Sequence, residues 1–198
     1  MATGYFVADG AGAMTVTPRI RAHIELARTL YGLESEIERC GEALVHRLNN
    51  GGKVLFLGCG GSAAMAQHLA AELLVRFRDN RRPLPGIALA DPSVLTAAAN
   101  DLGWEQALAR PVLALAGAAD AVVALSTSGE SAAVLVAARA ARQVGATLVA
   151  LTGAAPNGLA ALAHHAVCIP SRDTARIQEM HLFLGHLWCE MIEDRCGR

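Results

Sequence analysis

The sequence predicts an α/β fold, in which a parallel sheet of about five strands is flanked by helices on both faces. Five short apolar runs are typical of strands buried on both sides, and they lie at residues 53–58, 86–90, 121–127, 147–153 and 165–170. Helical patterns separate these runs, and such alternation favours parallel strands. The 198 residues match the size of one domain and contain no internal repeat, low-complexity tract or inter-domain linker.

The helices are expected in the same alternating order. A long first helix is predicted from Pro18 to about Asn49, with Thr17 as its N-cap. The later helices are expected at about residues 62–78, within 91–117, and at 129–144, 157–163 and 174–194. Residues 1–16 have no clear pattern, so we predict an N-terminal extension there and a domain over residues 17–198.

Composition and charge argue against several classes of protein. The net charge of −1 gives no overall attraction to nucleic acid or to an anionic membrane, and the basic stretch at 78–82 fits a solvated helix exit. The first residues lack the pattern of a signal peptide, and the apolar runs are too short to span a bilayer. The five cysteines include no C-x-x-C pair, so we expect reduced thiols and a cytoplasmic protein.

A glycine-rich turn, GCGGS at residues 58–62, follows the first predicted strand. Glycine lets a backbone approach a ligand closely, and the N-terminus of the following helix favours a negative group. In parallel sheets, ligands bind at such strand-to-helix junctions. The G-x-G-x-x-G spacing of a dinucleotide site is absent, however, and the alternative is a tight turn that binds nothing.

A second strand-to-helix junction, STSGES at residues 126–131, is rich in hydroxyl groups. Four short hydroxyl side chains and a glycine at a helix N-terminus suit a phosphate group. Ordinary capping by Thr127 or Ser128 is the alternative, although one cap needs only one hydroxyl. Glu130 would repel a phosphate unless its carboxylate points outward. Neither junction has the Lys of a Walker motif, so hydrolysis of nucleoside triphosphates is not expected.

Two helices carry residues that suggest metal binding or acid–base chemistry. His68 and Glu72 are four residues apart, so both project from one face of the helix that begins at the glycine turn. Gln178 and His186 lie in the last helix, about 80° apart and two turns along, and could face one pocket while His181 points elsewhere. The alternatives are a weak surface pair for His68 and Glu72, and a core histidine for His186.

Four segments together resemble the sugar isomerase (SIS) domain family, and within it the phosphoheptose isomerases. They are GCGGSAAMAQHLAAEL at 58–73, ANDLGW at 99–104, STSGES at 126–131 and RDTARIQEMHLFLGH at 172–186. They occur in the family's order and spacing, and the resemblance covers about residues 17–194. It implies isomerisation of D-sedoheptulose 7-phosphate to D-glycero-D-manno-heptose 7-phosphate through an enediol, the first step toward ADP- and GDP-heptose precursors.

The resemblance also implies roles for individual residues. One zinc ion per subunit would be held by His68, Glu72, Gln178 and His186, of which Glu72 and His186 would form the acid–base pair. The implied substrate contacts are Gly60, Gly61, Ser62, Glu72, Asn100, Asp101, Ser126, Thr127, Ser128, Ser131 and Gln178. The resemblance further implies a homotetramer whose active sites lie at subunit interfaces and bind a sugar phosphate. From the net charge and the short apolar runs, we expect no nucleic-acid or membrane partner.

Three positions depart from the family's usual pattern. Cys59 stands where Asn is usual, Met65 where Asp is frequent, and Glu130 where Asn is common. A thiol is a weaker hydrogen-bonding group than an amide, so an isomerase of another sugar phosphate is one alternative. A non-catalytic SIS protein, of the type associated with the bacterial replication initiator, is another. Such a protein would be expected to have lost the residues matched here by Glu72 and His186.

Overall fold

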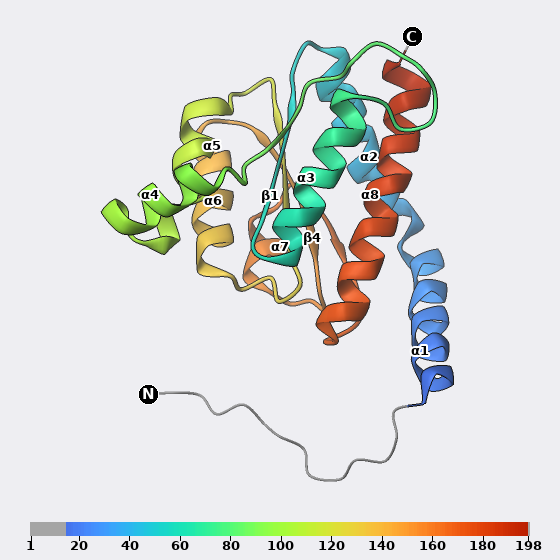
Figure 1. Cartoon of the computed structure of the whole chain (residues 1–198). Coiled ribbons are helices and arrows are strands. Elements are labelled where there is room, and N and C mark those ends of the chain that lie inside the picture. Colours follow the sequence, from blue (N-terminus) through green and yellow to red (C-terminus); the bar gives the residue numbers. More distant parts are fainter. Residues whose placement is uncertain (1–14, 198) are drawn as a thin grey trace, which may run out of the picture.

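Five parallel strands form the sheet in the computed structural model, which describes residues 15–197 (Figure 1). The strands are β1 (Val54–Gly58), β2 (Gly86–Ala88), β3 (Ala121–Ser126), β4 (Thr147–Thr152) and β5 (His165–Cys168). Their order across the sheet is β2-β1-β3-β4-β5, and each neighbouring pair is parallel. The predicted parallel α/β fold is therefore confirmed.

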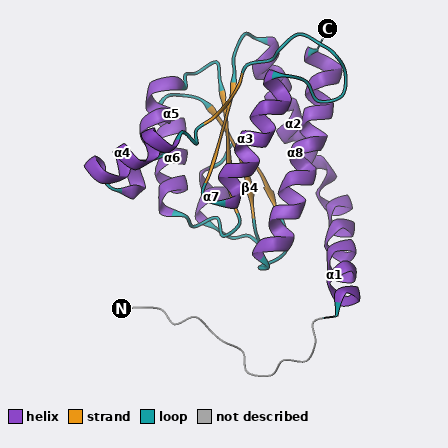
Figure 2. Ribbon diagram, viewed as in Figure 1, coloured by secondary structure: helices purple, strands orange, loops and turns teal. Residues whose placement is uncertain are grey.

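Helices cover both faces of the sheet (Figure 2). The helices on one face are α2 (Glu34–Asn49), α3 (Gly61–Leu74) and α8 (Thr174–Cys196). The elements on the other face are α4 (Pro92–Leu102), the 3₁₀ turn η2 (Trp104–Gln106), α5 (Ala109–Leu115), α6 (Ala132–Gln143) and α7 (Gly158–Leu162). Each parallel strand is thus connected to the next by helical segments that return over a face of the sheet.

Side chains of the central strands alternate between two hydrophobic cores. Val54 and Phe56 of β1 pack on the side of α2, α3 and α8, whereas Leu55 and Leu57 pack on the side of α5 and α6. Every residue of β1, β3 and β4 is buried. Burial on both faces explains why these strands appear in the sequence as continuous apolar runs.

The predicted long N-terminal helix is present, and the structure adds two details. It consists of α1 (Val16–Arg28), a 3₁₀ turn η1 (Thr29–Leu33) and then α2, which together run to Asn49. The N-cap is Thr15, and the prediction of Thr17 is wrong. Pro18 tolerates the earlier start because the first four N–H groups of a helix have no partner within the helix.

Three further expectations from the sequence can be compared with the structure. Of the predicted extension, residues 1–14 lie outside the described part of the chain. Among residues 15–197, no helix is long and apolar enough to cross a membrane. All five cysteines are described, and each is a free thiol.

Candidate active site

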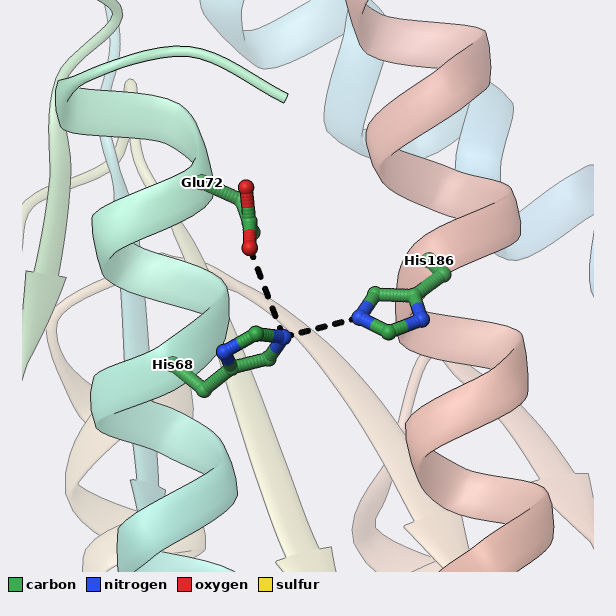
Figure 3. A group of neighbouring side chains, drawn as sticks. All are labelled: His68, Glu72 and His186. Carbon is green, nitrogen blue, oxygen red and sulfur yellow. Dashed lines mark hydrogen bonds and ion pairs between the residues drawn. The ribbon is translucent and has the colours of Figure 1, made fainter. Parts of the chain in front are cut away.

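His68, Glu72 and His186 meet between α3 and α8 (Figure 3). His68 Nε2 lies 2.8 Å from His186 Nε2 and 3.4 Å from Glu72 Oε1. One ligand atom from each of the three residues lies within 4.8 Å of the other two. In Figure 3, the dashed lines from the Glu72 carboxylate and from the His186 ring meet at His68 Nε2. The structure therefore brings together three of the four predicted metal ligands, which we call the His–Glu–His group.

The close approach of α3 and α8 explains why these side chains meet. Gly185 directly precedes His186, and a Cβ at Gly185 would lie only 2.6 Å from Cδ2 of Leu69, the neighbour of His68. A glycine is needed for helices packed this tightly, because protein interiors leave no room for the extra methyl group. Both helices also follow parallel strands and return over the same face of the sheet. They therefore run in the same direction. His186 lies at the same level along this pair of helices as His68, since their Nε2 atoms are 2.8 Å apart.

The surroundings of His186 favour its neutral form. Burial lowers the pKa of His186 and the neighbouring His68 lowers it further, whereas the carboxylates of Glu72 and Glu190 act in the opposite direction. The Phe77 ring lies against the His186 ring, with centroids 5.5 Å apart, and shields it from water. A neutral imidazole nitrogen is the form that binds a metal ion or accepts a proton.

The donor atoms of the His–Glu–His group fit a divalent metal ion. Two imidazole nitrogens and a carboxylate oxygen are ligand types that zinc prefers. Bonds of about 2.0–2.1 Å would place tetrahedral ligand atoms about 3.3 Å apart. Two separations, 2.8 Å between the imidazole nitrogens and 3.4 Å between His68 Nε2 and Glu72 Oε1, lie on either side of that value. Three protein ligands would leave a coordination position open.

Gln178 and His181 are on the same helix as His186 but lie outside the His–Glu–His group. The Gln178 amide lies beside the first turn of α3, because a Cβ at Gly61 would be 2.9 Å from its Nε2. Gln178 precedes His186 by eight residues, which is about 12 Å along the axis of α8. The Gln178 amide therefore lies nearer to the glycine turn than to His186. His181 is fully buried and its Nε2 donates to the Thr152 carbonyl oxygen at 3.2 Å. Burial lowers the pKa of His181 to about 4.

The glycine turn closes tightly at the end of β1. Gly60 has a φ of 57°, in the left-handed region that favours glycine. A Cβ at Gly58 would lie 2.6 Å from the Cβ of Ser62, and the Ser62 N–H donates to the Cys59 carbonyl oxygen at 3.1 Å. Gly60 and Gly61 are exposed, whereas Ser62 is buried beneath them. The turn therefore presents bare backbone that a ligand can approach.

The hydroxyl loop, residues 126–131, follows β3, which is the neighbour of β1 in the sheet. Its hydroxyls shape the loop: Ser126 Oγ accepts from the Gly129 N–H at 3.1 Å, and Ser128 Oγ accepts from the Glu130 N–H at 3.1 Å. The Ser128 side chain is exposed, so its hydroxyl can also reach a ligand. The glycine turn and the hydroxyl loop thus lie side by side at one edge of the sheet.

Two contacts join the hydroxyl loop to its neighbours. The Glu130 carboxylate accepts from the Gly158 N–H at 2.6 Å, so it points toward α7. Cys59 Sγ lies 3.7 Å from Ser131 Oγ, which links the glycine turn to the hydroxyl loop. Thr127 and Ser131 are half-buried. The bond to Gly158 thus fixes the direction of the Glu130 carboxylate, toward α7.

Asn100 and Asp101 lie apart from these groups. Both are exposed at the C-terminal end of α4, where the Asn100 amide donates to the Asp101 carboxylate at 2.8 Å. α4 lies on the opposite side of the sheet from α3 and α8 (Figure 1). Within one chain, these two residues are therefore separated from the His–Glu–His group.

A buried ion pair next to the group was not predicted. The basic stretch 78–82 is expected to be a solvated helix exit, but the side chain of Arg81 within it is only 3% exposed, and its Nε lies 3.0 Å from Oε1 of Glu193. A run of arginines in a sequence does not show which one is buried. The one hint is Glu193 itself, a carboxylate near the end of a mostly apolar helix.

Relatives of known family match most of this chain. The SIS domain family model matches residues 21–153. A phosphoheptose isomerase of Roseiflexus sp. (strain RS-1) is 46% identical over 180 residues, which cover 90% of this chain and 91% of that protein. A phosphoheptose isomerase of Helicobacter hepaticus is 42% identical over 183 residues, which cover 92% of this chain and 93% of that protein.

Solved structures agree with these sequence relatives. A phosphoheptose isomerase from Francisella tularensis superimposes with a TM-score of 0.84 at 33% identity, covering 90% of this chain and 96% of that one. A phosphoheptose isomerase from Neisseria gonorrhoeae superimposes with a TM-score of 0.81 at 37% identity, covering 91% of this chain and 100% of that one. By sequence and by fold, the chain belongs to the SIS domain family and, within it, to the phosphoheptose isomerases.

Proposed function

We propose that the protein isomerises D-sedoheptulose 7-phosphate to D-glycero-D-manno-heptose 7-phosphate, a precursor of ADP- or GDP-heptose. The observation that carries this proposal is the meeting of Glu72 and His186 beside His68, on the fold of a family whose relatives are named phosphoheptose isomerases. An acid–base pair within a metal-binding group suits proton transfer between adjacent carbons. We place the reaction in the cytoplasm, where free cysteine thiols such as these are usual.

The reaction moves a proton between C1 and C2 of the sugar through an enediol. Glu72 acts as the base: its carboxylate removes a proton from C1 of the ketose and delivers it to C2 of the aldose. His186, which starts in its neutral form, accepts the proton from O1 and gives a proton to O2, so it returns to the neutral form. The ligand atoms of the two side chains lie within 4.8 Å of each other, a separation that supports their acting on adjacent carbons.

Zinc is the proposed cofactor, with one ion per subunit. His68, Glu72 and His186 would hold it, and Gln178 would serve as a fourth ligand or as a contact to the substrate. When bound, the ion would act as a Lewis acid that stabilises negative charge on the sugar oxygens. The position of the Gln178 amide beside Gly61 supports its role as a substrate contact, because the sugar is expected at the glycine turn.

The substrate phosphate is assigned to the hydroxyl loop, and the sugar backbone to the glycine turn. The residues proposed for the phosphate are Ser126, Thr127, Ser128 and Ser131, and those proposed for the sugar are Gly60, Gly61 and Ser62. Because Glu130 points toward α7, no carboxylate of the loop opposes the phosphate. Binding the end of the substrate that does not react holds the other end at Glu72 and His186.

A homotetramer with active sites at subunit interfaces completes the proposal, and two exposed apolar areas support it. The first area lies on α1, η1 and α8 and consists of Val16, Ile20, Ile24, Tyr31 and Phe183. The second comprises Val94, Leu102 and Trp104, which are exposed on α4 and η2. Two distinct contacts are what a dihedral tetramer needs. Asn100 and Asp101 adjoin the second area, where a neighbouring subunit would lie.

The proposal is tested by NMR of sedoheptulose 7-phosphate with the purified protein in D₂O. Spectra are recorded before chelation, after chelation, and after zinc is restored. We expect conversion to mannoheptose 7-phosphate with uptake of deuterium, loss of turnover on chelation, and recovery with zinc. No turnover and no deuterium exchange at C1, from folded and zinc-replete protein, would contradict the proposal.

A further inference from the structure

A buried ion pair joins the end of α3 to α8. Arg81 Nε lies 3.0 Å from Glu193 Oε1, and the two side chains are only 3% and 7% exposed. Charged side chains are rarely buried this deeply unless they are paired. Such a pair adds little stability compared with apolar packing, but removing one partner leaves a buried charge unpaired. A specific geometric role is therefore the better explanation for it.

The remaining donors of Arg81 hold the last turn of α3. Its Nη2 donates to the Glu72 carbonyl oxygen at 2.8 Å, and its Nη1 donates to the Leu73 carbonyl oxygen at 3.0 Å. Carbonyl groups in the last turn of a helix have no partner within the helix, and a cation there also interacts favourably with the helix dipole. One guanidinium therefore fixes the backbone of the residue that carries the proposed base.

The remaining acceptor capacity of Glu193 holds the segment that follows α3. Its carboxylate accepts from the backbone N–H groups of Phe77 at 3.2 Å, Arg78 at 2.9 Å and Asp79 at 3.1 Å. These bonds hold Phe77 where its ring covers the His186 ring, 5.5 Å away between centroids. Glu193 itself lies seven residues, or about two turns, beyond His186 on α8.

We propose that Arg81 and Glu193 form a clamp whose role is to position the His–Glu–His group. The clamp ties the Glu72 backbone, the Phe77 ring and the helix of His186 to one charged pair. It therefore sets the spacing between Glu72 on α3 and His186 on α8, and with it the affinity of the group for a metal ion. Arg81 and Glu193 are positioning residues, and their effect on turnover rests on the proposed isomerase function.

The test compares Arg81→Lys and Glu193→Gln with the wild-type full-length protein, using Co²⁺ as the probe. Lysine can still pair with Glu193 but cannot bridge the two carbonyl oxygens of α3, because it lacks the planar fork of arginine. Residues that orient metal ligands typically contribute 10- to 100-fold in metal affinity. We expect the Co²⁺ affinity of both variants to fall by about that factor, with an altered visible spectrum of the bound ion.

The matched control is Arg195→Lys. Arg195 forms an ion pair with Glu42 that also joins α8 to another helix, α2, but both side chains are about half exposed, and Arg195 lies nine residues beyond His186. Its Co²⁺ affinity and spectrum should match those of the wild type. If Arg81→Lys fails to fold, Glu193→Asp replaces it, because the shorter carboxylate keeps the charge while loosening the contacts to α3 and its following segment.

Folded clamp variants that bind Co²⁺ with wild-type affinity and spectrum would overturn the inference. An equal loss of affinity in Arg195→Lys would overturn it as well, because any ion pair on α8 would then suffice. The kcat of the clamp variants should fall at least tenfold while the KM changes less. A wild-type protein that binds Co²⁺ but does not isomerise the heptose phosphate would contradict the proposed function alone, since the Co²⁺ affinities still decide the role of the clamp.

Discussion

The two parts of the candidate site are built in different ways. The glycine turn and the hydroxyl loop follow adjacent strands, and contacts within a few residues shape them, such as the bond from the Gly129 N–H to Ser126 Oγ. The His–Glu–His group instead joins His68 and His186, which are 118 positions apart in the chain. No local turn holds these two residues together. Their geometry depends on how α3 packs against α8.

This difference separates the proposed binding part of the site from the proposed chemical part. A locally shaped loop keeps its form when distant packing changes, so it can hold the phosphate end of a substrate steadily. A group assembled by helix packing is sensitive to displacements of about 1 Å, and proton transfer needs that accuracy. Substitutions in the loops should therefore change chiefly KM, and substitutions around the helices should change chiefly kcat and metal affinity.

Removing the proposed base should give the largest effect on the chemical part. Glu72→Gln keeps the side-chain size but cannot accept the C1 proton, so kcat should fall by about 10³-fold or more. The NMR assay measures the turnover, and circular dichroism together with gel filtration should match the wild type. Turnover near the wild-type rate would show that Glu72 is not the base. The His–Glu–His group could then not be called the chemical part of the site.

The pH dependence of stability tests whether the charge of Glu193 stabilises the packing of α3 against α8. Burial opposes ionisation of Glu193, but the N–H groups of Arg78, Asp79 and Phe77 and the Arg81 guanidinium outweigh it, so the pKa of Glu193 is lowered. A carboxyl group with a lowered pKa stabilises the fold above its unfolded-state value, about 4.3, and the contribution disappears as the pH falls through the folded-state pKa.

The wild type should therefore exceed Glu193→Gln in stability by about 1.5–3 kcal/mol at pH 7, the range for hydrogen bonds to charged groups. The difference should persist at pH 5 and shrink steadily below about pH 4. Urea unfolding of both proteins at each pH measures it. A difference that stays constant down to pH 3 would show that the carboxylate charge is not responsible.

Close packing of α3 and α8 can be disturbed by one methyl group. Gly185→Ala would place a Cβ 2.6 Å from Leu69 Cδ2, so the Leu69 side chain or the two helices must shift, with an expected loss of about 1–3 kcal/mol in unfolding free energy. Gly32→Ala is the matched control, because nothing lies within 4 Å of a Cβ there. Equal losses of stability and metal affinity in the two variants would contradict the importance of this contact.

Removing one hydroxyl should affect the binding part alone. Ser128→Ala should raise the KM for the phosphorylated sugar by about tenfold with little change in kcat, because one hydrogen bond to a charged group is lost. Steady-state kinetics measures both constants, and Ser35→Ala, an exposed serine on α2, provides a control. An unchanged KM would argue against the hydroxyl loop as the phosphate site.

Restoring the family's usual residue in the glycine turn should give the smallest effect. Cys59→Asn replaces a weak hydrogen-bonding group beside Ser131 with a stronger one, so KM should fall by about two- to fivefold. Kinetics with sedoheptulose 7-phosphate measures it. A higher KM would indicate that the thiol is adapted to a different sugar phosphate.

Features determined by local sequence could be predicted, and those determined by long-range packing could not. The strands are recognisable because burial on both faces leaves runs such as Val122–Leu125 without polar residues. The two loops are recognisable because glycine and hydroxyl residues directly follow those strands. Periodicity likewise places His68 and Glu72 on one helix face, but it does not identify the helix that packs against that face.

Other details depend on distances that no local pattern contains. The Gln178 amide lies beside Gly61 because of how far α8 is displaced along α3. The burial of Arg81 follows from its contact with Glu193, more than a hundred positions later. The 3₁₀ turn between α1 and α2 contains Gly32 but no proline, and one glycine within a helical pattern does not predict where the helix changes. These features needed the folded chain.

α3 also connects the two parts of the site. It begins at the glycine turn and carries Glu72 about three turns later, so a rise of 1.5 Å per residue separates Gly61 from Glu72 by about 16 Å along the axis. Adding or removing one turn would shift the reacting end by about 5.4 Å relative to the binding end. The number of turns in α3 therefore sets the distance between the glycine turn and Glu72. That distance limits the length of a sugar that can contact both.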